Sequence, residues 1–133
     1  MRVIFADSYY YLALINGRDS AHARAVGFSR SASASTVTTA WVLTEVADGM
    51  SSPSDKDAFL RLLSSLKNNP LCRIVDPTPR LFDEGVKLYS SRKDKGWSLT
   101  DCISFVVMRE EKLSEALTGD RHFEQAGFTA LLA

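Results

Sequence analysis

Short runs of β-branched and aromatic residues alternate with longer amphipathic segments along almost the whole chain. Such a run between turn-forming residues is typical of a strand, whereas hydrophobic residues that recur every three or four positions indicate a helix. Strands that alternate with helices form mainly parallel sheets with both faces covered. We therefore expect an α/β fold with three layers, α/β/α, in one domain spanning residues 1–133.

The same patterns set the expected bounds of each element. A Ser/Ala-rich loop is expected at residues 29–35, and Thr39 is expected to cap the helix that follows the second strand. Residues 98–101 have the form of a capping box, with Asp in place of the usual Glu or Gln. Strands are expected at 3–5, 36–38, 72–75, 116–118 and 128–132, and helices at 9–15, 19–28, 40–50, 59–66, 81–92, 98–112 and 121–126.

Composition narrows the class of protein. The 133 residues include 16 basic and 16 acidic side chains, so the net charge is zero. This balance gives no sign of nucleic-acid binding through overall positive charge, and it does not exclude an RNA substrate. Cys72 and Cys102 are isolated, which is typical of a reducing cytosol. The N-terminal segment lacks a signal-peptide pattern, and no apolar run approaches the roughly 20 residues that span a bilayer. We expect a cytoplasmic protein without a membrane segment.

Four acidic residues fall where ligands bind in such folds. Asp7 follows the first expected strand and Asp120 the fourth, while Glu45 and Asp101 lie in the early turns of expected helices. Ligands of open parallel sheets bind outside the carboxyl ends of the strands. All four carboxylates can therefore converge in one crevice.

A metal ion would explain such a set. The residues after Asp101, 102–108, are apolar around nearly the whole helix, which indicates a buried helix. A carboxylate at its entrance needs a partner, because an unpaired buried charge costs several kcal/mol. Four carboxylates would also repel one another, and a divalent cation relieves that repulsion. Carboxylate ligands without matching Cys or His favour Mg²⁺ or Mn²⁺ over zinc.

Each acid also has a purely structural interpretation. Asp7 could cap the following helix, and Glu45 could be a solvated residue at the edge of its apolar face. Asp101 could bond the first-turn backbone, and Asp120 could belong to an ordinary turn. Taken singly, each structural interpretation is favoured, whereas the set of four at one edge favours a metal site. The patterns alone leave both hypotheses open.

The motifs themselves resemble a known family. Residues 3–8 (Val-Ile-Phe-Ala-Asp-Ser), 44–46 (Thr-Glu-Val), 98–104 (Ser-Leu-Thr-Asp-Cys-Ile-Ser) and 117–123 (Leu-Thr-Gly-Asp-Arg-His-Phe) are similar to those of PIN-domain ribonucleases, and most of all to VapC-type toxins. The resemblance covers essentially the whole chain. It implies a five-stranded parallel sheet of order 3-2-1-4-5, a site for Mg²⁺ or Mn²⁺, and endonucleolytic cleavage of single-stranded or structured RNA.

The resemblance also implies roles for individual residues. The family's acidic places fall to Asp7, Glu45, Asp101 and Asp120, with Ser8 and Thr118 in support and Gly119 as a mild variation. The acids would position cations for in-line attack by water, leaving a 5′-phosphate, and Glu45 or Asp101 could act through a water. Apart from the resemblance, Arg92, Lys93, Lys95, Arg121 and His122 flank the expected crevice in sequence and could meet phosphates or simply be solvated. A structural or surface role, rather than a catalytic one, is expected for His22. Trp41 and Trp97 could stack a base or pack in the core or a dimer interface.

Other enzyme classes with a similar fold require sequence motifs that this chain lacks. A phosphoacceptor receiver domain needs paired acids near the N-terminus and a late Lys, and a haloacid-dehalogenase-type phosphatase needs Asp-x-Asp where this chain has Asp7-Ser8-Tyr9. Both are disfavoured. A non-catalytic PIN-like binding module and a stand-alone RNA-processing nuclease remain alternatives to a toxin. For a toxin, the resemblance implies a homodimer and a small antitoxin whose C-terminal segment blocks the acidic pocket.

Overall fold

The computed structural model describes residues 2–31 and 33–133, and its centre is a parallel sheet of five strands. The strands are β1 (Arg2–Ala6), β2 (Ala34–Thr39), β3 (Cys72–Val75), β4 (Glu115–Leu117) and β5 (Thr129–Ala130). Their order, β3-β2-β1-β4-β5, confirms the expected 3-2-1-4-5 topology. The central strand β1 pairs with β2 on one side and with β4 on the other.

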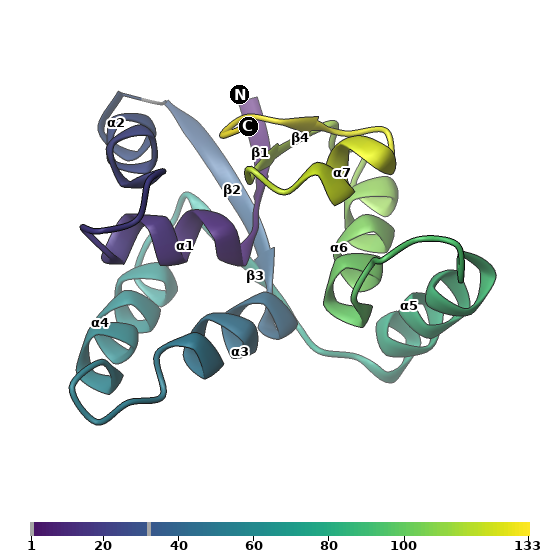
Figure 1. Cartoon of the computed structure of the whole chain (residues 1–133), viewed down its shortest axis with the longest axis horizontal. Coiled ribbons are helices and arrows are strands. Elements are labelled where there is room, and N and C mark those ends of the chain that lie inside the picture. Colours follow the sequence, from purple (N-terminus) through teal and green to yellow (C-terminus); the bar gives the residue numbers. More distant parts are fainter. Residues whose placement is uncertain (1, 32) are drawn as a thin grey trace.

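Helices cover both faces of this sheet, as Figure 1 shows. One face carries α1 (Ser8–Ile15), α2 (His22–Ser31), α3 (Ala40–Gly49) and α4 (Lys56–Lys67), and the other carries α5 (Pro79–Ser91), α6 (Leu99–Glu110) and α7 (Arg121–Gln125). The division follows from the strand order. Connections that run from β1 to β3 advance in one direction, the later ones advance in the other, and right-handed crossovers then place the two helix groups on opposite faces.

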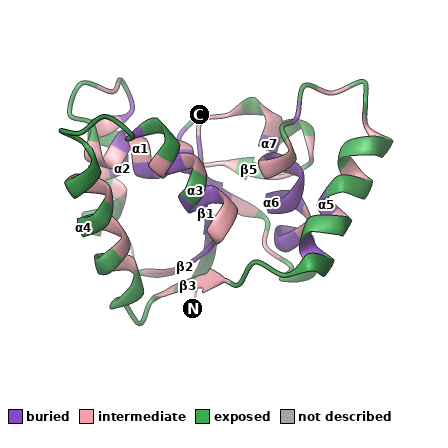
Figure 2. Cartoon of the chain, turned by 90° about the horizontal axis from the view of Figure 1, so that it is seen from below, coloured by how far each residue is buried: buried purple, intermediate pink, exposed green. Residues whose placement is uncertain are grey.

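Burial is greatest at the centre of the sheet and along α6. Ile4, Phe5 and Ala6 of β1 are fully buried, as is Phe105 of α6. Figure 2 shows the contrast between α6, which is buried along most of its length, and the outer helices α4 and α5. The expectation of a buried helix after Asp101 is therefore confirmed.

The ends of α6 have separate causes. Ser98 Oγ accepts from the Asp101 backbone N–H at 3.0 Å, and Asp101 Oδ2 accepts from the Ser98 N–H at 3.1 Å, which confirms the capping box. The helix ends at Glu110 rather than at residue 112, because Lys112 adopts a left-handed φ of 58°. The Leu113 N–H then bonds the Met108 carbonyl at 2.8 Å, as in a Schellman motif.

Other bounds also differ from the sequence prediction. The second helix begins at His22 rather than at residue 19, because the Asp19 carboxylate accepts from the Ala21 N–H at 2.8 Å in a turn. The last strand is limited to Thr129–Ala130, the two residues that pair with β4. The expected loop at 29–35 is shorter, since α2 reaches Ser31 and β2 starts at Ala34; residue 32 lies outside the described residues.

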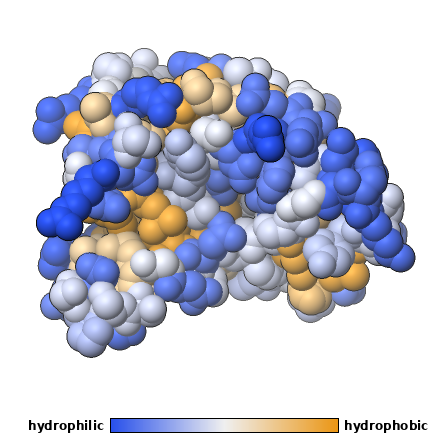
Figure 3. Space-filling view, in the orientation of Figure 1, coloured by the Kyte–Doolittle hydropathy of each residue, from blue (hydrophilic) through white to orange (hydrophobic). Residues whose placement is uncertain are grey.

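Helices α5 and α6 pack unusually closely. A Cβ atom on Gly85 would lie 2.3 Å from Cγ1 of Ile103, so only glycine fits this crossing. The outer side of α5 exposes Phe82, Val86 and Tyr89. On the face seen in Figure 3, hydrophilic residues cover most of the surface and hydrophobic ones gather in separate patches. None of the helices among the described residues has the length and apolarity to cross a bilayer.

Candidate active site

The carboxyl ends of the central strands form the edge of the sheet where the predicted acidic residues lie. Asp7 directly follows β1, and Asp120 follows β4 after a two-residue link. Helix α3, with Glu45, packs against α6, with Asp101, across this edge. Four separate elements therefore bring acidic side chains to one side of the molecule.

Asp7 is the most deeply placed of these acids, with 4% of its surface exposed. It occupies the position before α1, yet its side chain makes no capping hydrogen bond. Instead its Oδ2 accepts from Thr118 Oγ1 at 2.8 Å, across the pairing of β1 with β4. The helix-capping interpretation of Asp7 is therefore wrong, and its carboxylate is held by Thr118 instead.

Burial raises the pKa of Asp7 from 3.8 to about 7. The hydrogen bond from Thr118 opposes this rise, while the negative charges of Asp101 and Glu45 add to it. The charge of Asp7 is thus influenced by two carboxylates from other helices. A bound cation would favour the charged form of Asp7 and so oppose both the effect of burial and the repulsion by the two neighbouring carboxylates.

Glu45 and Ser8 are linked across two helices. The Ser8 hydroxyl donates to Glu45 Oε1, so the first residue of α1 holds a side chain of α3. Ser8 is buried and Glu45 is half-buried. Glu45 is therefore not the freely solvated residue of the structural interpretation.

Asp101 has both a structural and a potential chemical role. The capping bond uses its Oδ2, which also lies 3.1 Å from Nδ1 of the His122 ring. Burial raises the pKa of Asp101, and hydrogen bonds from the Ser98 backbone and from His122 oppose the rise. The structural interpretation of Asp101 is thus confirmed, but the helix cap leaves Oδ1 outside the capping bond.

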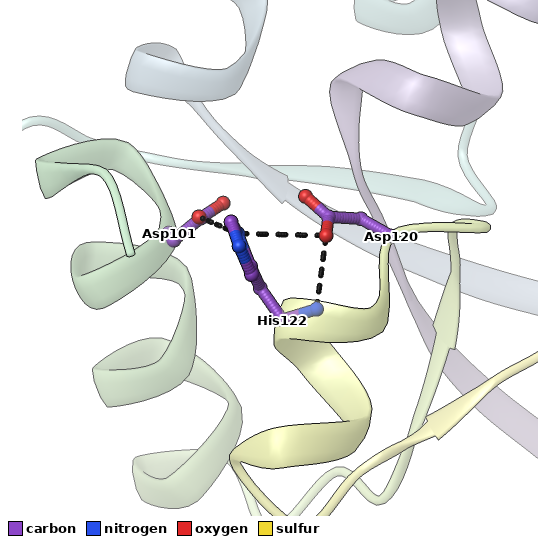
Figure 4. Close-up of side chains that lie close together, drawn as sticks. All are labelled: Asp101, Asp120 and His122. Carbon is purple, nitrogen blue, oxygen red and sulfur yellow. Dashed lines mark hydrogen bonds and ion pairs between the residues drawn. The ribbon is translucent and has the colours of Figure 1, made fainter. Parts of the chain in front are cut away.

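Asp120 and His122 complete a compact group. Asp120 Oδ1 accepts from the His122 backbone N–H at 2.9 Å and so caps the short helix α7. The same oxygen lies 3.4 Å from Nδ1 of the His122 ring. Figure 4 shows the ring between the two carboxylates. One ligand atom from each of Asp101, Asp120 and His122 lies within 4.8 Å of the others, close enough to share a divalent cation.

Thr118 joins this group to Asp7. Its Oγ1 accepts from the Asp120 backbone N–H at 3.1 Å while donating to Asp7. The structure thus brings Asp101, Asp120 and His122 into direct proximity and ties Asp7 to Asp120 through one hydroxyl. The donor set, two carboxylates and an imidazole beside a buried carboxyl, fits a divalent cation.

His122 is the residue whose position the sequence prediction did not anticipate. It was expected to meet phosphates, and its ring instead faces the carboxylates. The spacing of Asp120 and His122 fits a residue that caps a helix and accepts from the backbone N–H two positions later, but it does not indicate where the ring points.

Tyr9 and Gly119 also meet at this edge. A Cβ on Gly119 would lie 2.4 Å from Cζ and 2.5 Å from the hydroxyl of Tyr9. The phenol ring therefore lies against the backbone between Thr118 and Asp120. A side chain at this position would displace the end of the half-buried Tyr9 ring.

The basic residues that are candidates for substrate contacts differ in their exposure and in their present partners. Lys93 and Arg121 are exposed and Lys95 is half-buried. Arg92 instead makes two hydrogen bonds to Asp94, each 3.0 Å long, and its guanidinium lies 5.2 Å from the ring centre of Trp97.

Trp97, Trp41 and His22 are all packed against other parts of the fold. Trp97 is 5% exposed, packs edge-on against Phe105 and donates to Gln125, so core packing replaces the base-stacking hypothesis. Trp41 is half-buried against the core. The ring of His22 donates to the Ala13 carbonyl at 2.8 Å and so joins α2 to α1.

Solved structures share this architecture. The chain is similar to VapC20 of Mycobacterium tuberculosis, described as a sarcin–ricin loop cleaving toxin, with a TM-score of 0.86, 25% identity, and coverage of 95% of this chain and 96% of VapC20. It is also similar to a toxin–antitoxin complex from Klebsiella pneumoniae, with a TM-score of 0.64, 17% identity, and coverage of 89% and 87%. VapBC2 of Rickettsia felis, bound to promoter DNA, gives a TM-score of 0.65 at 14% identity, with 96% of each chain covered.

Sequence comparison gives the family. A search among curated proteins finds no match. The model of the PIN domain matches residues 4–129, a range that includes Asp7, Glu45, Asp101 and Asp120. On this match and on the strand order, the chain belongs to the PIN domain family.

Proposed function

We propose that this chain, acting as one PIN domain over residues 1–133, is a divalent-metal-dependent endoribonuclease. The observation that carries the proposal is Asp7: a buried carboxyl with a raised pKa, at a sheet edge where acids from three other elements gather. A buried carboxyl among other carboxylates is unfavourable for folding, and a bound cation compensates for it. Membership of the PIN domain family supports the nuclease activity.

In this proposal, Mg²⁺ or Mn²⁺ would be held by the carboxylates of Asp7, Glu45, Asp101 and Asp120. The bound cation would act as a Lewis acid that lowers the pKa of a water molecule and stabilises negative charge on the phosphodiester. Thr118 fixes the orientation of Asp7, and Ser8 fixes that of Glu45, through the hydroxyl contacts described above. Glu45, which accepts from the Ser8 hydroxyl, and Asp101, which accepts from the Ser98 backbone, are the candidates to act through a water.

RNA is held by basic residues around the acidic edge. Lys93 and Arg121 are exposed, so both can meet phosphates. Arg92 would first have to leave Asp94, so it contributes less. The likeness to VapC20 favours a structured RNA, and the sarcin–ricin loop belongs among the substrates to test.

The same likeness and the VapC-type motifs support a toxin role. We propose that the protein acts in the cytoplasm as the toxin of a toxin–antitoxin pair, as a homodimer, with a small antitoxin protein that covers the acidic pocket. A stand-alone RNA-processing nuclease would use the same residues without an antitoxin. A non-catalytic binding module would bind RNA and leave it intact.

Cleavage assays with purified protein test the activity. Total RNA, transfer RNA and a sarcin–ricin loop oligonucleotide are incubated with Mg²⁺ or Mn²⁺, and in parallel with EDTA. Asp7→Asn and Asp101→Asn are compared with Asp48→Asn, which neutralises an exposed acid on α3. We expect cleavage that EDTA, Asp7→Asn and Asp101→Asn abolish and that Asp48→Asn leaves unchanged.

Other outcomes separate the alternatives. Binding of these RNAs without cleavage in either metal, by protein shown to be folded, contradicts the nuclease proposal and supports a binding module. Induced expression in bacteria then distinguishes the biological roles of an active enzyme. Growth arrest that Asp7→Asn removes supports a toxin, whereas normal growth with the active enzyme supports RNA processing.

A further inference from the structure

The imidazole of His122 occupies the position of a metal ligand. The chain has two histidines, and only the ring of His122 faces the acidic edge, since that of His22 bonds to the Ala13 carbonyl. The side chain of His122 is 30% exposed and lies between those of Asp101 and Asp120, which are 11% and 35% exposed (Figure 4). The three side chains come from α6, from the loop before α7 and from α7 itself.

The distances suit coordination of one cation. In an octahedral complex with metal–ligand distances of about 2.1 Å, adjacent ligand atoms lie about 3.0 Å apart. Nδ1 of His122 is 3.1 Å from Asp101 Oδ2 and 3.4 Å from Asp120 Oδ1. Both carboxylates also have enough lone pairs to keep their helix-capping bonds while binding a cation.

The surrounding structure fixes which ring nitrogen faces the acids. The His122 backbone N–H is bonded to Asp120 Oδ1, which places the ring at the first turn of α7, beside α6. A Cβ on Gly96 would lie 3.8 Å from Nε2, so the loop around residue 96 lies on the far side of the ring. Nδ1 therefore faces the carboxylates, and Nε2 faces that loop.

We propose that Nδ1 of His122 is a direct ligand of the catalytic cation, together with Asp101 and Asp120, and that this nitrogen makes the site prefer Mn²⁺ over Mg²⁺. The inference rests on the proposed function, because it assumes that a cation binds at this edge. An imidazole nitrogen binds first-row transition ions better than it binds Mg²⁺, which prefers carboxylate and water oxygens. A site built from the acids alone would lack this preference.

The competing role for His122 is purely positional. With its proton on Nδ1, the ring would donate to Asp101 Oδ2 and orient that carboxylate without touching the cation. Both roles predict weaker metal binding when the ring is removed. They differ in whether a nitrogen lies in the coordination sphere, so the deciding measurement must detect that nitrogen directly.

Pulsed electron paramagnetic resonance of bound Mn²⁺ makes this measurement. A directly bound imidazole gives a ¹⁴N modulation, and ¹⁵N-histidine labelling of the unaltered protein changes it, so no variant needs to fold. We expect the modulation in the unaltered protein and in His22→Gln, and its loss in His122→Phe and His122→Asn. Calorimetric titration should show Mn²⁺ binding weakened at least about tenfold by His122→Phe, with Mg²⁺ binding weakened less.

The outcomes separate the two proposals. Mn²⁺ that binds without a histidine nitrogen overturns the ligand assignment and leaves the metal-dependent nuclease proposal standing. Equal weakening of Mg²⁺ and Mn²⁺ binding by His122→Phe overturns the selectivity. Failure of the folded, unaltered protein to bind Mn²⁺ overturns the ligand assignment and the metal dependence together.

Discussion

At the scale of single residues, two features of the environment of Asp7 have opposite effects on its pKa. Burial disfavours its charged form, and the hydroxyl of Thr118 favours it. The sequence placed Asp7 correctly at the end of a strand but could not show that its side chain bonds to Thr118 rather than capping the helix. That choice depends on Thr118, which is 111 positions away and becomes a neighbour only through strand pairing.

Removal of the Thr118 hydroxyl tests this contact. In Thr118→Val the buried carboxyl of Asp7 loses its donor while the side-chain shape is kept, so the free energy of unfolding should fall by about 1–3 kcal/mol. Mn²⁺ affinity should fall about 10- to 100-fold, because the orienting group is lost. Urea unfolding and calorimetric titration measure the two effects. Thr129→Val, at an exposed position of β5, should leave both unchanged; equal effects in the two variants would contradict the role of Thr118.

The contact between Tyr9 and Gly119 makes a second residue-scale prediction. Gly119→Ala places a methyl group 2.4 Å from Cζ of the half-buried Tyr9, so the ring must leave its present position and the free energy of unfolding should fall by about 0.5–1.5 kcal/mol. Removal of the ring in Tyr9→Ala should relieve the clash. A double-mutant cycle by urea unfolding therefore should show favourable coupling in Tyr9→Ala/Gly119→Ala. Strictly additive effects would mean that the two residues do not constrain each other.

At the scale of helices and strands, local capping signals were the most informative part of the sequence. The capping box at Ser98 and the cap at Thr39 are confirmed, because each depends only on residues within one turn. The end of α6 was misplaced because Lys112 adopts a left-handed conformation that residue type does not indicate. The orientation of the His122 ring was beyond prediction, since it depends on how α7 packs beside α6.

The crossing of α5 and α6 can be tested with two glycines. Gly85→Ala forces a methyl group into Ile103, so we expect the free energy of unfolding to fall by about 1–3 kcal/mol. Gly27→Ala, in α2 with open space around it, should instead raise it by about 0.5–1 kcal/mol through helix propensity. Thermal and urea unfolding measure both. A neutral Gly85→Ala would show that α5 can move away from α6 at little cost.

At the scale of the whole molecule, the raised pKa of Asp7 links stability to pH. The unfolded chain releases this proton near pH 3.8, whereas the folded protein keeps it to about pH 7. The folded state is therefore favoured below the lower value and loses stability as the pH rises between the two. The loss is about 1.4 kcal/mol for each pH unit in that interval.

Urea unfolding in EDTA at pH 5 and pH 8 measures this linkage. Asp7→Asn carries no charge at either pH, so it should be more stable than the unaltered protein at pH 8 and should depend less on pH. Asp48→Asn should follow the unaltered protein. If Asp7→Asn and the unaltered protein lose stability in parallel, Asp7 does not hold its proton in the folded state.

The order of the strands has a consequence for the synthesis of the protein. The central strand β1 is synthesised well before its neighbour β4 and the donor Thr118. A ribosome-bound chain that has emerged only as far as α6 already contains Asp7, Glu45 and Asp101, yet it has nothing to orient Asp7 and neither Asp120 nor His122. The acidic edge is thus assembled only after β4 and α7 have emerged, and a prematurely terminated chain that ends before β4 lacks three of the residues that build it: Thr118, Asp120 and His122.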